Sequence, residues 1–335
     1  MKWFLLVCLA ATAIVGAPER TSAEVIKLGT LAPQGSPWYD ALRDIGEAWK
    51  SESGGQIELR IYPGGVAGDE PDLVRKMRVD QLQAATLSGG GLQVIAPEVL
   101  ALMMPMMLRS DAELDYVRDH VGPDLEKILE AKGFKVLNWG DAGWVRFFTQ
   151  TPAIEPDDLK PLKLFVWAGD TATFDAWKAC GYHPVALAAT DILTALESRL
   201  INAVPTTPLA ALSFQWFGVA PHMTDIKWLP LVGATVISMR TWNAIPDALK
   251  PQLLQAARDV GARLRQQARP LEDRAIAAMV SHGLIVHAVA PDIAAVWQQR
   301  ANICLEKIIG PVVPAAMVEK VKKFRDEYRA QHGNQ

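Results

Sequence analysis

A nearly unbroken run of apolar residues lies at positions 162–167, close to the middle of the chain. A strand without a polar face is typical of a parallel sheet that helices cover on both sides. Asp170 follows at a position suited to a helix N-cap, and Gly181 is suited to the residue just past the helix end. Between them, Phe174 and Trp177 recur at helical spacing. The pattern therefore predicts a buried strand followed by a helix.

A second strand and helix continue this pattern. The strand is predicted at residues 183–187. The buried face of the next helix is expected to consist of Ile192, Leu196 and Leu200. In open parallel sheets, ligands bind beyond the carboxyl ends of the strands, where loops and helix N-termini meet. Phe165, Trp167 and the turn at 168–169 are therefore expected at the mouth of a binding site.

The rest of the chain alternates between strand and helix patterns. Strands are expected at residues 24–30, 57–61, 82–87, 134–139, 145–149 and 235–239. Helices are expected at residues 38–51, 70–79 and 111–132. The segment 140–144 is predicted to be a turn. This alternation, with short connections, predicts an α/β fold with a doubly wound sheet.

A long helical pattern covers residues 246–282, with an interruption expected at Pro270. About 35 residues at about 1.5 Å per residue span roughly 50 Å, which exceeds the width of one lobe of this size. The helix is therefore expected to brace two lobes, and 335 residues are enough for two cores. We predict that one lobe contains residues 24–146 and about 225–268, and the other residues 147–224 and about 269–335.

The N-terminus has the pattern of a secretory signal peptide. Lys2 supplies a positive start, and the apolar run 3–17 follows. Small residues at Thr21 and Ala23 suit cleavage, and the run is too short to span a hydrocarbon layer of about 30 Å. Residues 1–23 are therefore predicted to be a signal peptide removed near Ala23, which places the mature chain in the periplasm. An uncleaved anchor is the alternative.

The composition excludes some classes of partner. The chain is 50% hydrophobic and 21% charged, with a formal net charge of −3. No basic excess is present, so nucleic acid is not expected as a partner. Cys180 and Cys304 remain after cleavage, and the sequence leaves open whether they form a disulfide or stay reduced. The methionines at 101–108 are interpreted as core filling or a groove wall rather than a metal site.

Motifs of the common enzyme classes are missing from the sequence. It contains no HExxH, GxSxG, Walker loop or GxGxxG after a strand, and the six histidines lack metal-ligand spacing. The segment Ser88-Gly89-Gly90-Gly91 is interpreted as a ligand-facing turn rather than a catalytic loop. Helix capping explains Asp69 and Glu70. We therefore predict no enzyme activity and no cofactor, with a secreted hydrolase using Ser88 as the alternative from another class.

Short segments in order along the chain carry a resemblance to a known family. They are Ile26-Lys27-Leu28-Gly29-Thr30 with Gly35-Ser36-Pro37, Tyr62-Pro63-Gly64-Gly65 with Gly68-Asp69-Glu70, Asp158-Leu159-Lys160-Pro161-Leu162-Lys163-Leu164, Asp191-Ile192-Leu193-Thr194-Ala195-Leu196, and Ile201-Asn202-Ala203. With them the chain resembles the extracytoplasmic solute receptors of TRAP (tripartite ATP-independent periplasmic) transporters, a DctP-like family. The resemblance covers essentially the whole mature chain.

The resemblance implies a fold and a role. The fold is that of a two-lobed periplasmic binding protein, a clamp with a long helix bracing both lobes. The role is capture of a small organic acid between the lobes and its delivery to the membrane subunits of the transporter. A receptor that feeds an ATP-driven importer is the alternative among binding proteins.

The resemblance also implies an arginine in the central strand that pairs with the ligand carboxylate in a bidentate contact, which only a guanidinium offers. In this sequence that position is Phe165. An enclosed carboxylate without its partner faces a desolvation cost of at least several kcal/mol. We therefore predict a neutral or largely apolar ligand. Arg146 is the alternative ligand-binding residue, since it falls where some family members place a second ligand-facing arginine, and it would bind a carboxylate from the opposite wall. The competing structural interpretation is that Arg146 caps a carbonyl group or pairs with an acid across the hinge.

The predicted ligand site combines stacking and burial with a few hydrogen bonds. Its aromatic residues are Trp38, Trp144, Phe165 and Trp167, with Trp216 nearby. Its hydrogen-bonding residues are Ser36, Ser88, Thr206 and Thr207. Core packing is the competing interpretation for each tryptophan.

Overall fold

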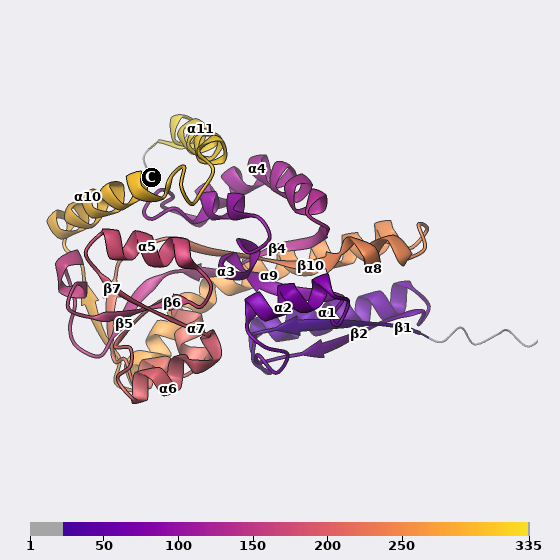
Figure 1. Ribbon diagram of the computed structural model, residues 1–335, viewed down its shortest axis with the longest axis horizontal. Coiled ribbons are helices and arrows are strands. Elements are labelled where there is room, and N and C mark those ends of the chain that lie inside the picture. Colours follow the sequence, from indigo (N-terminus) through magenta and orange to yellow (C-terminus); the bar gives the residue numbers. More distant parts are fainter. Residues whose placement is uncertain (1–22, 334–335) are drawn as a thin grey trace, which may run out of the picture.

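Two β-sheets form the framework of the computed structural model, which describes residues 23–333 (Figure 1). The first sheet has the strand order β2 (Ile57–Tyr62), β1 (Glu24–Thr30), β3 (Ala84–Ser88), β10 (Pro230–Ser238) and β4 (Phe134–Trp144). β1 runs parallel to β2 and β3, whereas β10 is antiparallel to β3 and β4. Residues 1–22 of the predicted signal peptide lie outside the described part of the chain.

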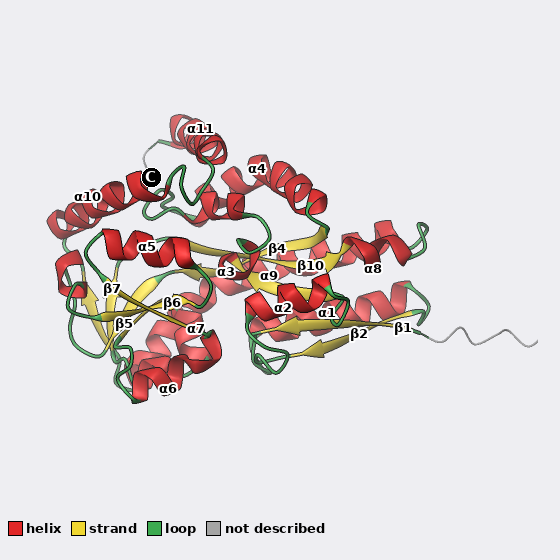
Figure 2. Ribbon diagram, in the orientation of Figure 1, coloured by secondary structure: helices red, strands yellow, loops and turns green. Residues whose placement is uncertain are grey.

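The second sheet is built from the middle of the chain and one later strand. Its order is β11 (Ile285–Ala288), β9 (His222–Asp225), β5 (Arg146–Thr149), β8 (Ala203–Thr206), β6 (Lys163–Trp167) and β7 (His183–Leu187). β6 is parallel to β7 and β8, and β5 is antiparallel to β8 and β9. Figure 2 shows the two sheets side by side, each with helices over it, which is the predicted two-lobed α/β architecture.

β6 has the buried character that its sequence predicts. Its residues 164–166 are exposed by 4% or less. The helix α5 (Thr171–Ala179) begins after Asp170, whose carboxylate accepts a hydrogen bond from the backbone N–H of Thr173 at 2.9 Å. Gly181 follows the helix with a φ of +86°, a conformation that glycine adopts without strain. The strand and helix prediction for this segment is confirmed.

Helices cover the faces of both sheets. Besides α5, the helices that precede residue 250 in the described chain are α1 (Pro37–Glu52), α2 (Glu70–Arg78), α3 (Gly89–Leu92), α4 (Asp111–Ala131), α6 (Ile192–Glu197), α7 (Pro208–Ser213) and α8 (Met239–Ala244). Short 3-10 helices are η1 (Pro97–Met103), η2 (Pro156–Leu159), η3 (Ala189–Asp191) and η4 (Trp216–Gly218). Met103, Met104 and Met107 are buried in the core of the first lobe, as expected for core filling.

The helix α9 (Lys250–Ser281) braces both lobes, as predicted. Near its start, Leu253 packs into the same core as Trp49 of α1 and accepts a hydrogen bond from its indole N–H at 2.8 Å. Near its end, Met279 packs into the core of the second sheet with Phe148. The helix spans about 48 Å at about 1.5 Å per residue. Because its two ends belong to different cores, α9 connects the lobes directly.

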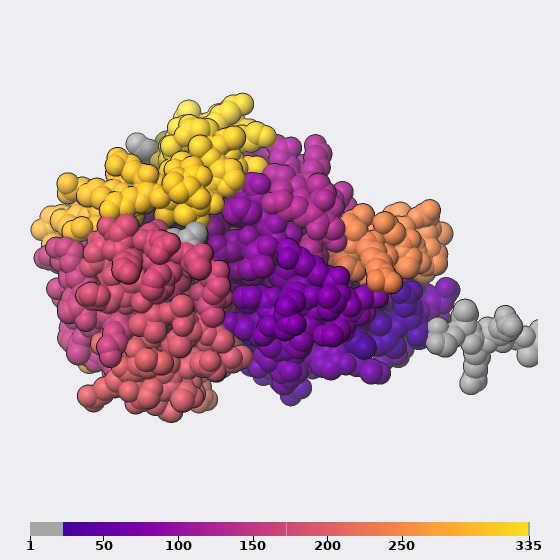
Figure 3. Space-filling model, viewed as in Figure 1, coloured from indigo at the N-terminus to yellow at the C-terminus, as the bar shows by residue number. Residues whose placement is uncertain are grey.

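The C-terminal helices lie over both lobes. α10 (Pro291–Ile308) packs on α5, and a disulfide between Cys180 and Cys304, with Cα atoms 6.1 Å apart, joins the two helices. The sequence left open whether these two cysteines are paired or reduced, and in the structure they are paired. α11 (Ala315–His332) instead packs on α4 of the first lobe. In the space-filling view, the yellow C-terminal residues cover the upper edge of both lobes (Figure 3).

The division of the chain into lobes at the predicted residues remains a prediction. Two features bear on where the lobes meet. Arg146, placed in the first lobe by the prediction, is the first residue of β5 in the second sheet. The C-terminal segment from 315 onward packs on the first lobe, although the prediction assigns it to the second.

Three local predictions are wrong. The segment 140–144 is part of β4 rather than a turn, because it pairs with β10 through a bulge. Pro270 lies inside α9 without ending it, since residues on both sides of the proline are buried against the two lobes. Leu200 is 49% exposed, because α6 ends at Glu197 and Arg199 takes a φ of +58°. Among residues 23–333, no helix combines the length and apolarity needed to cross a membrane.

Candidate functional site

Two cavities lie between the lobes, and each is lined by elements of both. The first, here called the cleft cavity, lies between α1 and the end of β3 on one side and the end of β8, α7 and η4 on the other. The second, here called the α5 cavity, lies between η1, β6, α5 and α10. Each has a volume of about 170 Å³. Trp167 and Leu231 line both cavities, which are therefore neighbours.

The cleft cavity forms where several strands end. Thr30 ends β1, Ser88 ends β3, Trp167 ends β6 and Thr206 ends β8, and all four residues line this cavity. Carboxyl ends of parallel strands are the usual place for ligands in open α/β sheets. Of the residues that the sequence predicts at the mouth of the site, Trp167 lines the cleft cavity and Phe165 lines the α5 cavity, whereas Ala168 and Gly169 line neither.

Glu70 is a residue of the cleft cavity that sequence reasoning missed. Asp69 caps α2 as expected, its carboxylate accepting a hydrogen bond from the backbone N–H of Glu70 at 2.9 Å. The carboxylate of Glu70 instead accepts two hydrogen bonds from Ser88, one from the backbone N–H at 2.8 Å and one from Oγ at 2.7 Å. Glu70 is 3% exposed, and this burial raises its pKa to about 7 despite the hydrogen bonds. A buried carboxyl group thus titrates near neutral pH in the wall of the cavity.

This burial predicts a pH dependence that Glu70→Gln removes. Because the pKa of Glu70 is higher in the folded protein than its ordinary value of 4.5, the folded state holds the proton more tightly. The stabilisation is fully present below about pH 4.5 and is lost as the pH rises to about 7. The free energy of unfolding of the unsubstituted protein should fall by up to about 3 kcal/mol over this window relative to Glu70→Gln. Urea titrations at pH 4.5, 6 and 8 measure the difference, and parallel pH profiles for the two proteins would contradict it.

The structure brings several of the predicted site residues together. Trp38, Ser88, Trp167 and Thr206 line the cleft cavity, as does Trp216. Phe165 lines the α5 cavity with Trp167, and their rings meet edge to face with centroids 5.4 Å apart. Phe165 also packs into the core of the second lobe and is 4% exposed.

Three further predicted residues line neither cavity and have other contacts. Ser36 and Thr207 are the N-caps of α1 and α7, with their hydroxyl groups accepting hydrogen bonds from backbone N–H groups. Trp144 is 2% exposed, and its indole N–H donates to Asp111 at 2.9 Å. These positions support helix starts and the core beside the cleft.

Arg146 also lies outside the linings of both cavities. Its Nε is 3.1 Å from a carboxylate oxygen of Asp225, and its Nη2 is 3.0 Å from Glu272 of α9. Its Nη1 donates to the backbone carbonyl of Trp144 at 3.3 Å. Each guanidinium nitrogen thus has a partner within the protein. The arginine ties β5 of the second sheet to the bracing helix, and these contacts are those of the structural interpretation of Arg146. Its predicted role in binding the ligand stays a prediction.

The charged residues that line the cavities are acidic. Asp141 lines the cleft cavity and is paired with Arg118 at 3.2 Å. Asp170 lines the α5 cavity and accepts a hydrogen bond from Gln93 of the first lobe at 2.7 Å. Within the described part of the chain, neither lining includes a lysine, arginine or histidine. The sequence indicated little of their place in the cavities. Asp141 follows a predicted strand, and Asp170 stands at a predicted helix start, where capping is the simpler explanation.

A model of the family described as bacterial extracellular solute-binding protein, family 7 (DctP), matches residues 28–310. The chain belongs to this family. Among characterised relatives, the 2,3-diketo-L-gulonate-binding periplasmic protein YiaO of Escherichia coli is 23% identical over 270 residues, covering 79% of this chain and 81% of the relative. The sialic acid-binding periplasmic protein SiaP of Vibrio cholerae is 20% identical, covering 85% of this chain and 89% of the relative.

Solved structures share the fold. A TRAP periplasmic solute-binding protein of Shewanella oneidensis with bound succinate superposes with a TM-score of 0.85 at 17% identity, covering 91% of this chain and all of the other. One of Xanthobacter autotrophicus with bound β-D-galacturonate gives a TM-score of 0.83 at 18% identity, covering 90% of this chain and 99% of the other. The predicted two-lobed fold and the membership of a DctP-like family are confirmed.

A family 7 protein is a solute-binding receptor rather than an enzyme, and family 7 receptors are periplasmic. Ser88 lies at the start of a helix. Its hydroxyl group donates to Glu70 and accepts a hydrogen bond from the backbone N–H of Gly90, so it caps α3.

Proposed function

We propose that this family 7 protein is the receptor of a TRAP-type secondary transporter and captures a neutral, largely apolar solute for delivery to the membrane subunits. The observation that carries the proposal is the charge of the two cavities. Among described residues their linings contain acidic groups and no basic group. The periplasmic location and the membrane partners are inferred from the family and from the relatives named above.

The charge of the cavities disfavours a carboxylate. A carboxylate enclosed between the lobes loses its hydration, and a guanidinium that binds it in a bidentate contact offsets that loss. Phe165 stands at the position where the family resemblance implies this arginine, and Arg146 is held by Asp225 and Glu272. The guanidinium of Arg118 is engaged by Asp141 and is 3% exposed. Arg146 and Arg118 are thus both engaged by carboxylates, and the described lining of neither cavity contains a cation.

The remaining groups suit a neutral solute. Trp38, Trp167, Phe214 and Trp216 provide aromatic surface in the cleft cavity. Glu70 has a pKa of about 7, so its carboxyl group is uncharged in part of the molecules at neutral pH. The relatives named above have carboxylate ligands, and the difference in ligand is proposed to follow from the substitution at Phe165.

Two hydrogen bonds between the lobes support a clamp mechanism in which ligand contacts select the closed state. Gln93, beside the cleft in the first lobe, donates to Asp170 at 2.7 Å. The backbone N–H of Ala189, in the second lobe, donates to Asp69 at 3.1 Å. Both bonds require the lobes to be close together, so opening the clamp breaks them.

Replacing Gln93 by alanine should weaken solute binding by roughly tenfold. The closed state then loses a hydrogen bond to a charged group, which contributes about 1.5 kcal/mol. Titration calorimetry gives the dissociation constant, and small-angle scattering gives the fraction of closed molecules. Gln81→Ala, at an exposed position outside both cavities, is the matched control. Equal affinities of the two variants would contradict this role of the Gln93–Asp170 bond.

Ligand screening tests the proposed function. Thermal unfolding is measured with neutral aromatic and aliphatic compounds and, separately, with succinate and galacturonate. A neutral ligand at about 100 times its dissociation constant should stabilise the protein by about 2.7 kcal/mol, and the carboxylates should leave the midpoint unchanged. Native mass spectrometry of the purified protein identifies a solute carried through purification. Stabilisation by succinate or galacturonate alone would overturn the apolar ligand.

A further inference from the structure

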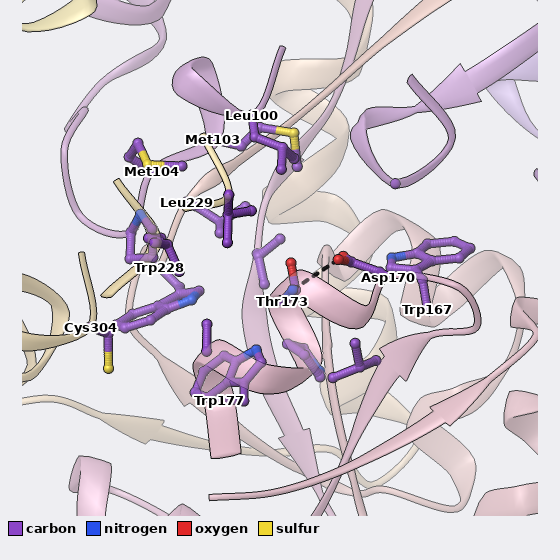
Figure 4. A pocket seen from close by; sticks show the side chains of 18 of the residues that line it. Leu100, Met103, Met104, Trp167, Asp170, Thr173, Trp177, Trp228, Leu229 and Cys304 are labelled. Atoms are coloured by element: carbon purple, nitrogen blue, oxygen red, sulfur yellow. Dashed lines mark hydrogen bonds between the residues drawn. The ribbon is translucent and has the colours of Figure 1, made fainter. Parts of the chain in front are cut away.

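The α5 cavity is a second space between the lobes, and position 165 is the one residue of its lining at which the family resemblance implies a ligand contact. Its walls come from the end of η1, from α5, from the segment around Trp228 and from α10, which the disulfide ties to α5. Figure 4 shows Met104, Leu229 and Trp177 around a common space, with Trp167 and Asp170 at one end. The cavity is therefore a defined pocket with one wall shared with the cleft.

Trp167 lies at the boundary between the two cavities. It lines both of them, together with Leu231. Its indole packs on the backbone of Gly90, where an added Cβ atom would lie 3.2 Å from the ring. Gly90 thus permits the indole to approach the first lobe closely. A solute that contacts Trp167 in the cleft cavity is next to the α5 cavity.

The two cavities differ in the distribution of polar groups. The cleft cavity has polar side chains on both of its sides, among them Glu70, Asn138 and Thr206. In the α5 cavity, the polar side chains other than tryptophan are Gln93, Asp170 and Thr173. Asp170 accepts a hydrogen bond from the side chain of Gln93 at 2.7 Å. It also accepts one from the backbone N–H of Thr173 at 2.9 Å (Figure 4). At one end of the α5 cavity, the side-chain amide of Gln93 and the carboxylate of Asp170 are therefore hydrogen-bonded to each other. The rest of the cavity wall, apart from Thr173, is aliphatic, aromatic or sulfur-containing.

The size of the α5 cavity suits a small apolar group. An engineered apolar cavity of about 150 Å³ in another protein binds benzene, and the α5 cavity measures about 170 Å³. Met103 and Met104 are unbranched and adapt to the shape of what they contact. A single ring or a short alkyl chain fits such a space.

We propose that the α5 cavity receives the apolar end of the transported solute, while a neutral hydrogen-bonding head lies in the cleft cavity. The solute is then an elongated amphiphilic molecule that passes Trp167. This inference rests on the proposed function, because it assigns the two ends of the same neutral ligand. It predicts that affinity depends on the length of the apolar end and that filling the α5 cavity removes this dependence.

Binding of benzene and of primary alcohols from ethanol to decanol tests the proposal. In the unsubstituted protein, affinity for the alcohols should rise about fourfold per methylene group until the cavity is full. Ala176→Leu, on the wall formed by α5, should abolish benzene binding and stop the rise at a shorter chain. Ala179→Leu, at an exposed position of the same helix outside the cavity, should behave like the unsubstituted protein. Ala210→Leu, in the cleft cavity, should weaken all alcohols by a similar factor.

A crystal soaked with iodobenzene gives a readout that does not depend on any variant. The iodine atom is expected between Met104, Trp177 and Leu229. Alcohol binding without any dependence on chain length, or with a dependence that Ala176→Leu leaves unchanged, would overturn the inference and leave the proposed function standing. Binding of succinate but of no alcohol, with iodobenzene still in the α5 cavity, would overturn the neutral ligand while retaining the cavity as an apolar site.

Discussion

Replacing Arg146 by methionine is expected to destabilise the protein by about 3–5 kcal/mol. The guanidinium is 5% exposed and contacts Asp225, Glu272 and the carbonyl of Trp144. Removing one member of a buried ion pair leaves the other charge uncompensated, and such changes cost about 3–5 kcal/mol. Glu272 is the affected group, since its own side chain is 13% exposed and burial already raises its pKa above the ordinary value. Urea unfolding at pH 7 measures the change.

The same substitution separates the two hypotheses for Arg146. If the arginine is structural, binding of neutral solutes is retained in the folded variant, and Arg146→Met with Glu272→Gln recovers part of the lost stability because no buried charge is left unpaired. Arg43→Met is the control, since the side chain of Arg43 is 55% exposed and its surface ion pairs contribute about 0–1 kcal/mol. Unchanged stability together with loss of a carboxylate ligand in Arg146→Met would instead identify Arg146 as the ligand-binding arginine.

Features set by local sequence were predictable. The central strand, the Asp170 cap and the Gly181 termination depend on residues within one strand and one helix. The bracing role of α9 followed from its length alone. In each case the apolar pattern and the capping residues agree with the tertiary packing, so the local signal is sufficient.

The failures come from contacts between distant parts of the chain. The segment 140–144 contains glycine and suggests a turn, yet Gly140 pairs with Gly233 of β10 and the strand continues. Pro270 disfavours a helix locally, but packing on two lobes maintains α9 through it. Such pairings decide the structure and leave no mark in the local sequence.

The site shows the same limit. Glu70 stands at the start of a predicted helix, and only the folded structure shows that it binds Ser88 and lines the cleft cavity. The partners of Arg146, Asp225 and Glu272, stand far from it in sequence, so no spacing indicates an ion pair. Trp167 was easier to predict, because it ends a strand that the apolar pattern predicts, and ligands bind beyond such strand ends.

Replacing Phe165 by arginine is expected to change the class of ligand. The new guanidinium would stand in the wall of the α5 cavity beside Trp167, at the position where the resemblance implies the carboxylate-binding arginine. Without an anion, a buried unpaired charge costs several kcal/mol, so the variant should unfold more easily than Phe165→Leu and bind neutral solutes at least about 100-fold more weakly. Succinate should then restore stability, because two hydrogen bonds to charged groups contribute about 1.5–3 kcal/mol each.

The comparison of Phe165→Arg with Phe165→Lys makes this expectation specific. Lysine carries the same charge but cannot make the bidentate contact, so succinate should stabilise Phe165→Arg more than Phe165→Lys, and Phe165→Leu not at all. Thermal unfolding with and without succinate measures all three, and circular dichroism confirms that each is folded. An equal response of all three variants would show that position 165 does not select the charge of the ligand. If succinate stabilised the unsubstituted protein, the phenyl ring of Phe165 would not exclude carboxylates. A cation at a position other than 165 would then have to bind the carboxylate in the cleft.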